Sequence, residues 1–175
     1  MTRRRAPATG LQLDVVDRGT PRTPRPFLAR VVQAALAHGG RPDLPVSLLL
    51  TGDREIARLH AEFLDDPTPT DVISFDVDGG AELVVSVDTA RRVAKQKGNE
   101  ARAEVALYVV HGLLHVMGWD DLQAKARAEM RAAEAAVMRT LGLAYAPVEE
   151  DGQAARGKRK AVARAKAKRR GARRG

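Results

Sequence analysis

The order of hydrophobic and polar positions predicts strands and helices that alternate along the first half of the chain. Short apolar runs bounded by Gly, Pro or Asp are typical of strands, whereas apolar residues at steps of three and four are typical of amphipathic helices. These patterns predict strands at 11–16, 46–50, 71–76 and 82–86, with helices at 26–38 and 53–64. We expect the first strand at a sheet edge, and the last two to form a hairpin through Asp78-Gly79-Gly80.

The second half of the chain is predicted to be helical, with one helix ending at Lys97 and others at 100–117 and 122–141. Ser86 or Asp88 can cap the first of these helices, and Asn99 can cap the second. The helix at 100–117 is apolar nearly all round from Val105 onward, which predicts that it lies inside the domain. Together the elements predict an α/β (α+β) fold, in which about five helices pack a small mixed four-stranded sheet.

The composition predicts a single packed domain with a basic extension. At 175 residues and 44% hydrophobic residues, the chain can bury a sizeable core. We expect one domain at 11–147, a flexible basic arm at 1–10, and a disordered basic tail at 148–175 that has almost no large apolar residue. Residues 151–175 hold 11 Lys/Arg and one acid, which leaves 30 − 11 = 19 basic and 22 − 1 = 21 acidic residues in 1–150. The excess positive charge therefore belongs to the tail and says little about the fold.

The residue types and segments that are missing narrow the chemistry and the location. The chain has no cysteine, so disulfides and thiolate metal sites are excluded, and any metal must be bound by His, Asp or Glu. No apolar run approaches the length of a transmembrane helix, and no apolar segment follows Arg3-Arg4-Arg5 as it would in a signal peptide. We therefore expect a cytoplasmic protein without a membrane partner.

Two histidines on the predicted buried helix suggest a metal site near its C-terminal end. His111 and His115 are four residues apart, so both imidazoles lie on one helix face and can reach one ion. Gly118 can end the helix, and Asp120 and Asp121 follow where the returning chain can offer a third ligand. The alternatives are ordinary hydrogen-bonded core histidines, and aspartates that only cap the next helix.

Three protein ligands would leave zinc an open position for water, which is the arrangement of zinc hydrolases. Glu104 lies seven residues before His111 on the same helix face, and could accept a hydrogen bond from a ligand's second ring nitrogen. Gly112 stands where His-Glu-x-x-His peptidases carry their general base, so a standard zinc peptidase is disfavoured. The remaining histidines, His38 and His60, are predicted to be structural or surface residues.

Residues 111–121, His-Gly-Leu-Leu-His-Val-Met-Gly-Trp-Asp-Asp, resemble the signature His-Gly-x-Leu-His-Leu-x-Gly-Tyr-Asp-His of the YbeY family of metal-dependent endoribonucleases. Upstream, residues 69–75 resemble the family's Pro-Thr-Asp-Val-Leu-Ser-Phe segment, and residues 82–86 resemble its Gly-Asp-Ile-x-Ile-Ser strand. Glu104 falls where the family has a glutamate before the signature helix. The similarity spans 46–141 in matching order, so the combination is more specific than any one segment.

This resemblance implies a mixed α/β fold, one zinc ion, and cleavage that is selective for single-stranded RNA, in ribosomal RNA maturation and ribosome quality control. It implies a ribosomal RNA precursor as the substrate and makes the small ribosomal subunit a candidate partner. The residues that match the three metal ligands by position are His111, His115 and Asp121. The catalytic base stays open, as does the choice between attack by water and removal of a proton from the ribose 2′-hydroxyl.

The resemblance also implies which side chains surround the metal. Asp120 matches the aspartate before the third ligand, and Thr70, Asp71 and Ser74 would lie beside the cleft. The alternative for Thr70 and Asp71 is that they only satisfy backbone groups of their own loop.

Two positions depart from the family pattern. Asp121 stands where the third ligand is usually histidine, and a carboxylate lowers the net charge of the site by one, which predicts a higher pH optimum. Leu64 stands where many members carry an arginine, so a phosphate held there would need another cation, such as Arg58 or the tail. Both departures favour a second hypothesis, a catalytically weakened or inactive RNA-binding ribosome-assembly factor with the same fold.

The tail is predicted to bind RNA through its phosphates. It has no aromatic residue to stack on bases, so backbone electrostatics remains, with an affinity that falls steeply with salt. A solvated tail without a binding role is the alternative. The basic residues concerned are Arg156, Lys158, Arg159, Lys160, Arg164, Lys166, Lys168, Arg169, Arg170, Arg173 and Arg174.

Overall fold

A mixed four-stranded sheet forms the centre of the molecule in the computed structural model, which describes residues 10–147. The strands are β1 (Leu13–Asp17), β2 (Val46–Thr51), β3 (Val72–Val77) and β4 (Gly80–Ser86), in the order β1-β2-β4-β3. β1, β2 and β4 are parallel, and β3 pairs antiparallel with β4. The predicted edge position of the first strand and the hairpin of the last two are confirmed. The predicted tail at 148–175, and all but one residue of the arm at 1–10, lie outside the described residues.

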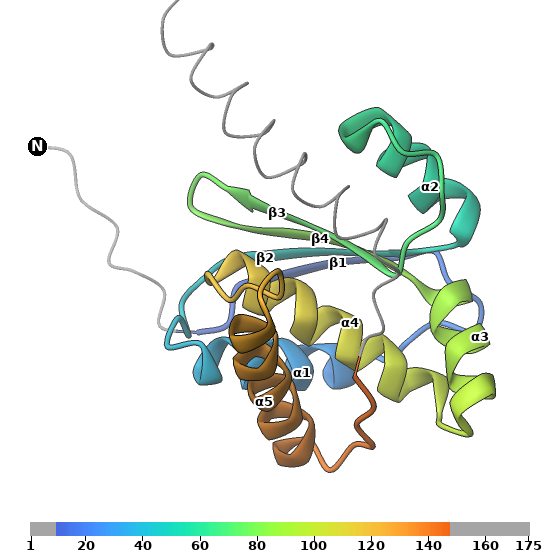
Figure 1. The fold of residues 1–175 in the computed structure, drawn as a ribbon. Helices are drawn as coiled ribbons and strands as arrows, with labels where there is room; N and C mark the ends of the chain where they lie inside the picture. Colours follow the sequence, from blue (N-terminus) through green and yellow to red (C-terminus); the bar gives the residue numbers. More distant parts are fainter. Residues whose placement is uncertain (1–9, 148–175) are drawn as a thin grey trace, which may run out of the picture.

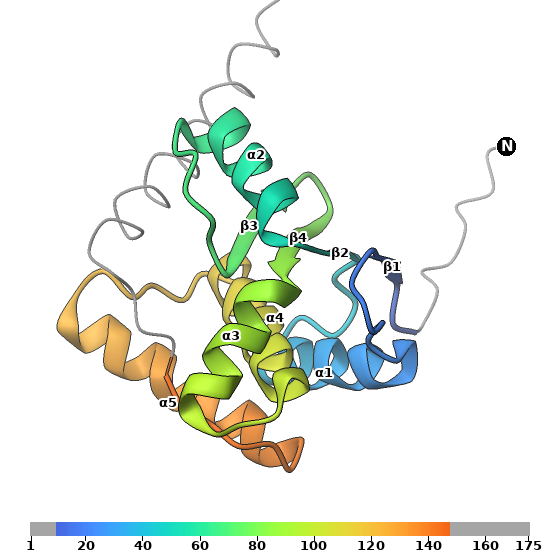
Figure 2. The same cartoon turned by 90° about the vertical axis from the view of Figure 1, so that its right-hand side faces the viewer.

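Helices cover both faces of this sheet (Figures 1 and 2). They are α1 (Arg25–His38), α2 (Asp53–Leu64), α3 (Val87–Lys97), α4 (Ala101–Val116) and α5 (Ala124–Thr140). α1, α4 and α5 lie on one face and α2 lies on the other, while α3 follows β4 at the end of the sheet. The predicted fold class, a small mixed sheet packed by five helices, is confirmed. Within the described residues, no helix is both long enough and apolar enough to cross a membrane.

The alternation of side chains along the strands divides the core into two parts. Leu83 and Val85 of β4 belong to the large cluster shared with α1, α4 and α5, whereas Val84 between them belongs to a small cluster with Ile56 of α2. α4 lies in the middle of the large cluster and is buried on all sides from Ala103 to Leu114. The all-round apolar pattern therefore predicted the burial of this helix correctly.

Local hydrogen bonds explain where the helices begin. The hydroxyl of Ser86 accepts a hydrogen bond from the backbone N–H of Thr89, so Ser86 caps α3 as predicted. The prediction that Asn99 caps α4 is wrong, because the cap residue is Glu100 and the Asn99 amide instead donates to a carboxylate oxygen of Glu104 at 3.4 Å. The last helix begins at Ala124, two residues later than predicted.

Candidate metal centre

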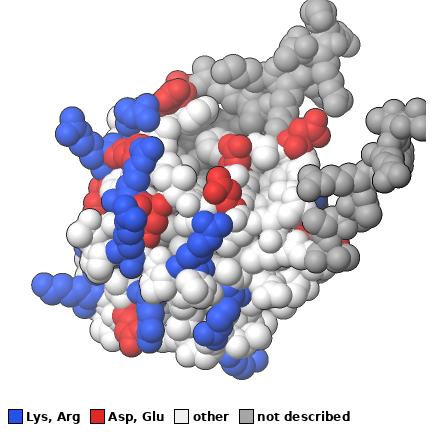
Figure 3. All heavy atoms as spheres, turned by 180° about the vertical axis from the view of Figure 1, so that it is seen from behind, with Lys and Arg blue, Asp and Glu red and all other residues white. Residues whose placement is uncertain are grey.

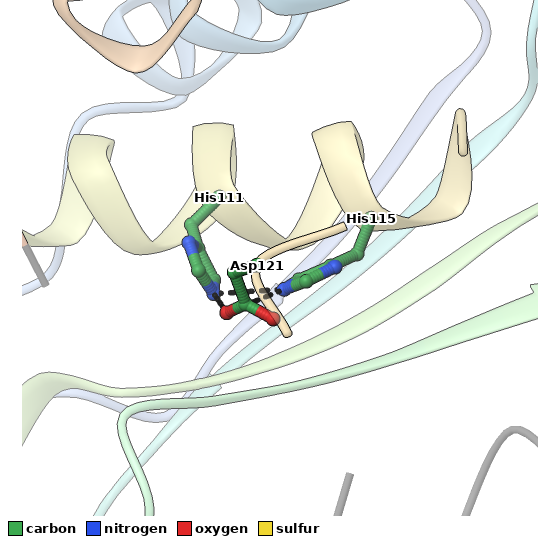
Figure 4. Close-up of side chains that lie close together, drawn as sticks. All are labelled: His111, His115 and Asp121. Atoms are coloured by element: carbon green, nitrogen blue, oxygen red, sulfur yellow. Dashed lines mark hydrogen bonds and ion pairs between the residues drawn. The ribbon is translucent and has the colours of Figure 1, made fainter. Parts of the chain in front are cut away.

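Three side chains converge beside the C-terminal end of α4 (Figure 4). His111 and His115 project from one face of the helix, and Asp121 meets them from the loop that follows. Gly118 has a φ of 103°, a conformation that costs glycine little, and it turns the chain back toward the helix. His111 and Asp121 are only 3% and 8% exposed, while His115 lies at the solvent side of the group. Each side chain offers one ligand atom, and these atoms all lie within 4.8 Å of one another.

The spacing of the three ligand atoms suits one small metal ion. The two histidine Nε2 atoms lie 3.1 Å apart, and an Asp121 oxygen lies 4.0 Å from the Nε2 of His111 and 3.5 Å from that of His115. Two nitrogens bound tetrahedrally to one zinc at about 2.05 Å would be roughly 3.3 Å apart. The observed separations of 3.1, 3.5 and 4.0 Å therefore bring the three atoms close to the spacing that one zinc ion requires.

The partners of the other ring nitrogens fix which nitrogen offers a lone pair. The Nδ1 of His115 lies 3.1 Å from the backbone oxygen of Trp119, and a carbonyl oxygen can only accept, so Nδ1 carries the proton. The Nδ1 of His111 lies 2.7 Å from a carboxylate oxygen of Glu134, to which it donates. In the neutral rings both Nε2 atoms then point lone pairs at the same space as the buried Asp121 carboxylate, an arrangement that a cation stabilises.

Glu134 of α5 was not among the residues predicted from the sequence. It is 2% exposed, and its second oxygen accepts a hydrogen bond of 2.9 Å from the hydroxyl of Tyr145. Burial and the neighbouring Glu134 charge raise the pKa of Tyr145, so its phenol stays a donor. A signal was present, because Glu134 interrupts the apolar stripe of α5 between Met130 and Val137 with a charge that must be compensated.

The prediction that Glu104 accepts from a ligand histidine is wrong. Seven residues are about two helical turns, or roughly 10.5 Å, so a residue on the same face is still too far along the axis to reach His111. Glu104 is 2% exposed near the start of α4 and lies 3.6 Å from the ammonium group of Lys97. The carboxylate that contacts His111 comes from a different helix, which spacing along one helix could not reveal.

The two consecutive aspartates have different surroundings. Asp120 is exposed, and its carboxylate accepts a hydrogen bond of 3.0 Å from the backbone N–H of Leu122. Asp121 is buried with its carboxylate at the histidines, and its backbone oxygen accepts from the guanidinium of Arg127 at 2.9 Å. The structure therefore brings Asp121, and not Asp120, to His111 and His115.

The other residues predicted near the metal lie on β3 and the loop before it. The Asp71 carboxylate accepts hydrogen bonds from the backbone N–H of Val72 at 2.7 Å and from the Thr70 hydroxyl at 3.1 Å. Ser74 is half-buried, two residues beyond Val72, and so lies on the strand face that packs against α4. Neither Asp71 nor Ser74 belongs to the group of three potential ligands.

The two histidines outside the group of potential metal ligands contact a backbone oxygen and an aromatic ring. His60 is 3% exposed within α2, and its Nδ1 lies 2.8 Å from the backbone oxygen of Thr68. His38 is exposed at the end of α1, with its ring centroid 6.2 Å from that of Trp119. Arg58, a candidate phosphate cation, forms an exposed ion pair with Glu62.

The amino-acid sequence of this chain is similar to the endoribonuclease YbeY family and to individual members of it. The sequence model described as endoribonuclease YbeY matches residues 21–142. The endoribonuclease YbeY of Heliobacterium modesticaldum is 34% identical over 137 residues, which cover 67% of this chain and 82% of the relative. That of Rhodopirellula baltica is 40% identical over 134 residues, covering 71% of this chain and 68% of the relative. The solution structure of TM1509 from Thermotoga maritima shares the fold, with a TM-score of 0.56 and 23% identity over 74% of this chain and 89% of its own.

Proposed function

Because this chain belongs to the endoribonuclease YbeY family, we propose that it hydrolyses single-stranded RNA in ribosomal RNA maturation and ribosome quality control, with one bound zinc ion. The observation that carries this proposal is the convergence of two imidazole nitrogens and a buried carboxylate at the end of α4. The substrate would be a ribosomal RNA precursor in the cytoplasm, and the small ribosomal subunit is a candidate partner.

The donor set favours zinc over the alkaline-earth ions. Mg²⁺ and Ca²⁺ prefer oxygen ligands, whereas His111 and His115 supply nitrogen and Asp121 supplies oxygen. These three side chains would hold the ion, which when bound stabilises negative charge on the oxygens of a phosphodiester. Glu134 and the backbone oxygen of Trp119 keep the two imidazoles oriented for that task.

Basic side chains on the surface of the domain and basic side chains of the tail would both attract RNA. Figure 3 shows Lys and Arg among Asp and Glu side chains on one face of the described residues, with basic side chains prevailing in its lower half. The strongest run of positive charge in the sequence lies at 156–174. We assign this run to non-specific contact with RNA phosphates, since no aromatic residue accompanies it.

The decisive experiment combines zinc content with RNA cleavage. Zinc per chain is measured for the wild type and for His115→Ala, and each protein is given a labelled single-stranded RNA and the same RNA annealed to its complement. We expect zinc and cleavage of the single strand for the wild type, and loss of both for His115→Ala. His38→Ala, which removes an exposed histidine outside the group of three, is the control and should retain both.

Two other results would contradict the proposal. A wild-type chain that takes up no zinc would remove its premise. A chain that binds zinc and RNA without cleaving would support the second candidate, a ribosome-assembly factor, which is favoured by Asp121 standing where the family's third ligand is usually histidine. Product ends add detail, since attack by the ribose 2′-hydroxyl leaves a cyclic phosphate and direct attack by water does not.

A further inference from the structure

A line of three side chains, of which His111 and Glu134 are buried and Tyr145 is half-buried, connects the metal site to the segment that follows α5. The His111 imidazole donates to one oxygen of Glu134 at 2.7 Å, and the Tyr145 hydroxyl donates to the other at 2.9 Å. We propose that Glu134 and Tyr145 are positioning residues that set the tautomer of His111 and thereby the affinity of the site for zinc. This inference rests on the metal ligands of the proposed function.

The first step concerns the proton on His111. A neutral imidazole can carry its proton on either nitrogen, and only the form with the proton on Nδ1 directs a lone pair from Nε2 toward His115 and Asp121. The Glu134 carboxylate can only accept, so it selects this form. It also places a negative charge against the ring, which strengthens the nitrogen as a donor to a cation.

The second step concerns the orientation of the Glu134 carboxylate. Glu134 is 2% exposed, so its two oxygens depend on protein donors in place of water. With Tyr145 bound to one oxygen, rotation of the carboxylate would break two hydrogen bonds at once. Tyr145 therefore holds the other oxygen against His111 and supplies the second donor that a buried carboxylate needs.

The third step explains how Tyr145 is kept in place. Leu143 packs against the large core cluster, and its backbone N–H donates to the oxygen of Met138 at 3.0 Å. At the other end of the segment, the Lys97 ammonium group lies 3.4 Å from the backbone oxygen of Pro147 and 3.6 Å from Glu104. Residues 143–147 are thus held on both sides of Tyr145. Glu104, near the start of α4, helps to hold the segment because it pairs with Lys97.

The test measures zinc affinity by competition with a chelator, and the His111 tautomer by ¹⁵N NMR of the metal-free protein. Glu134→Gln keeps the size of the side chain and removes its charge, and we expect zinc affinity to fall about 10–100-fold. Tyr145→Phe should lower it by a smaller factor and increase the population of His111 with the proton on Nε2. The controls are Glu129→Gln, on the exposed face of the same helix, and Tyr108→Phe, at the chain's other tyrosine.

The outcomes separate this inference from the function on which it rests. If His111→Ala retains zinc, the ligand assignment of the proposed function fails. If His111→Ala loses zinc but Glu134→Gln and Tyr145→Phe keep the wild-type affinity and tautomer, the ligands stand and the positioning role is overturned. A folded Glu134→Gln variant with weak zinc binding and an unchanged Tyr145→Phe variant would overturn the part assigned to Tyr145.

Discussion

Leu83 of β4 lies against Gly112 of α4 so closely that a Cβ atom on Gly112 would come within 2.9 Å of the Leu83 side chain. The same atom would lie 3.1 Å from the Val72 side chain of β3. Position 112 therefore faces the sheet, while His111 and His115 face the metal site. The absence of a glutamate after the first histidine follows from packing, and position 112 cannot supply a general base in this fold.

Gly112→Glu, which would create the His-Glu-x-x-His pattern, is expected to damage the fold without adding peptidase activity. The substitution forces a charged side chain between α4 and the sheet, which should cost roughly 4 kcal/mol or more. Urea denaturation followed by circular dichroism measures this loss. Arg102→Glu, at an exposed position of the same helix, should change the free energy of unfolding by less than about 1 kcal/mol. A stable Gly112→Glu protein would contradict the packing argument.

The neighbouring aspartates should differ sharply in their effect on metal binding. Asp121→Ala removes a buried carboxylate whose oxygen lies 3.5 Å from the Nε2 of His115, so bound zinc should be lost or strongly weakened. Asp120→Ala removes an exposed carboxylate that bonds only a loop N–H in the described structure, and zinc content should stay at the wild-type level. Atomic absorption on dialysed protein gives both values. A wild-type zinc content in Asp121→Ala would show that Asp121 is not a ligand.

Asp121→His should shift the pH dependence of RNA cleavage. A carboxylate removes one unit of positive charge from the site that a neutral imidazole leaves in place. We therefore expect the variant to reach half-maximal cleavage at a lower pH than the wild type. Initial rates between pH 5 and pH 9 at saturating zinc provide the measurement, and Asp120→His serves as the control. An unchanged or upward shift would argue against the charge effect.

The sequence predicted the framework of this protein better than the contacts across it. Strand positions, the hairpin and the buried helix follow from local patterns, and His111 and His115 follow from a spacing within that helix. The role of Glu134 could not be derived in this way, because α5 brings it to His111 across 23 positions of sequence. The prediction for Glu104 rests on its helix face and on a matching family glutamate, and the distance along the helix axis excludes a hydrogen bond to His111. Asn99 was a suitable capping residue that formed a hydrogen bond with Glu104 instead.

Asp53 should make stability fall in acid. Burial raises the pKa of this carboxyl, but hydrogen bonds from Ser86, Thr89 and Arg92 outweigh that effect and hold its pKa below the ordinary value of 3.8. The lowered folded pKa means that the stabilisation is fully present above about pH 3.8 and is lost as the pH falls through the folded value. Asp53→Asn should therefore cost about 1–2 kcal/mol at pH 7 and less at a pH well below 3.8.

Urea denaturation of both proteins at the two pH values tests this expectation. Asp14→Asn, at an exposed carboxylate of β1, is the matched control and should change stability by less than about 0.5 kcal/mol at either pH. A difference between wild type and Asp53→Asn that does not shrink in acid would show that the charge of Asp53 is not what its partners stabilise.

Deletion of residues 151–175 should flatten the salt dependence of RNA binding. The segment contains 11 Lys/Arg and one acid, and each phosphate contact that it makes adds close to 0.7 to the slope of log affinity against log salt for a single strand. Filter binding of a single-stranded RNA between about 50 and 300 mM salt, on either side of the roughly 0.1 M at which the Debye length is about 10 Å, gives the slope. A full-length chain with its tail Lys/Arg replaced by Gln distinguishes charge from length, and it should behave like the deletion. An unchanged slope in both variants would locate the RNA phosphates on the domain instead of the tail.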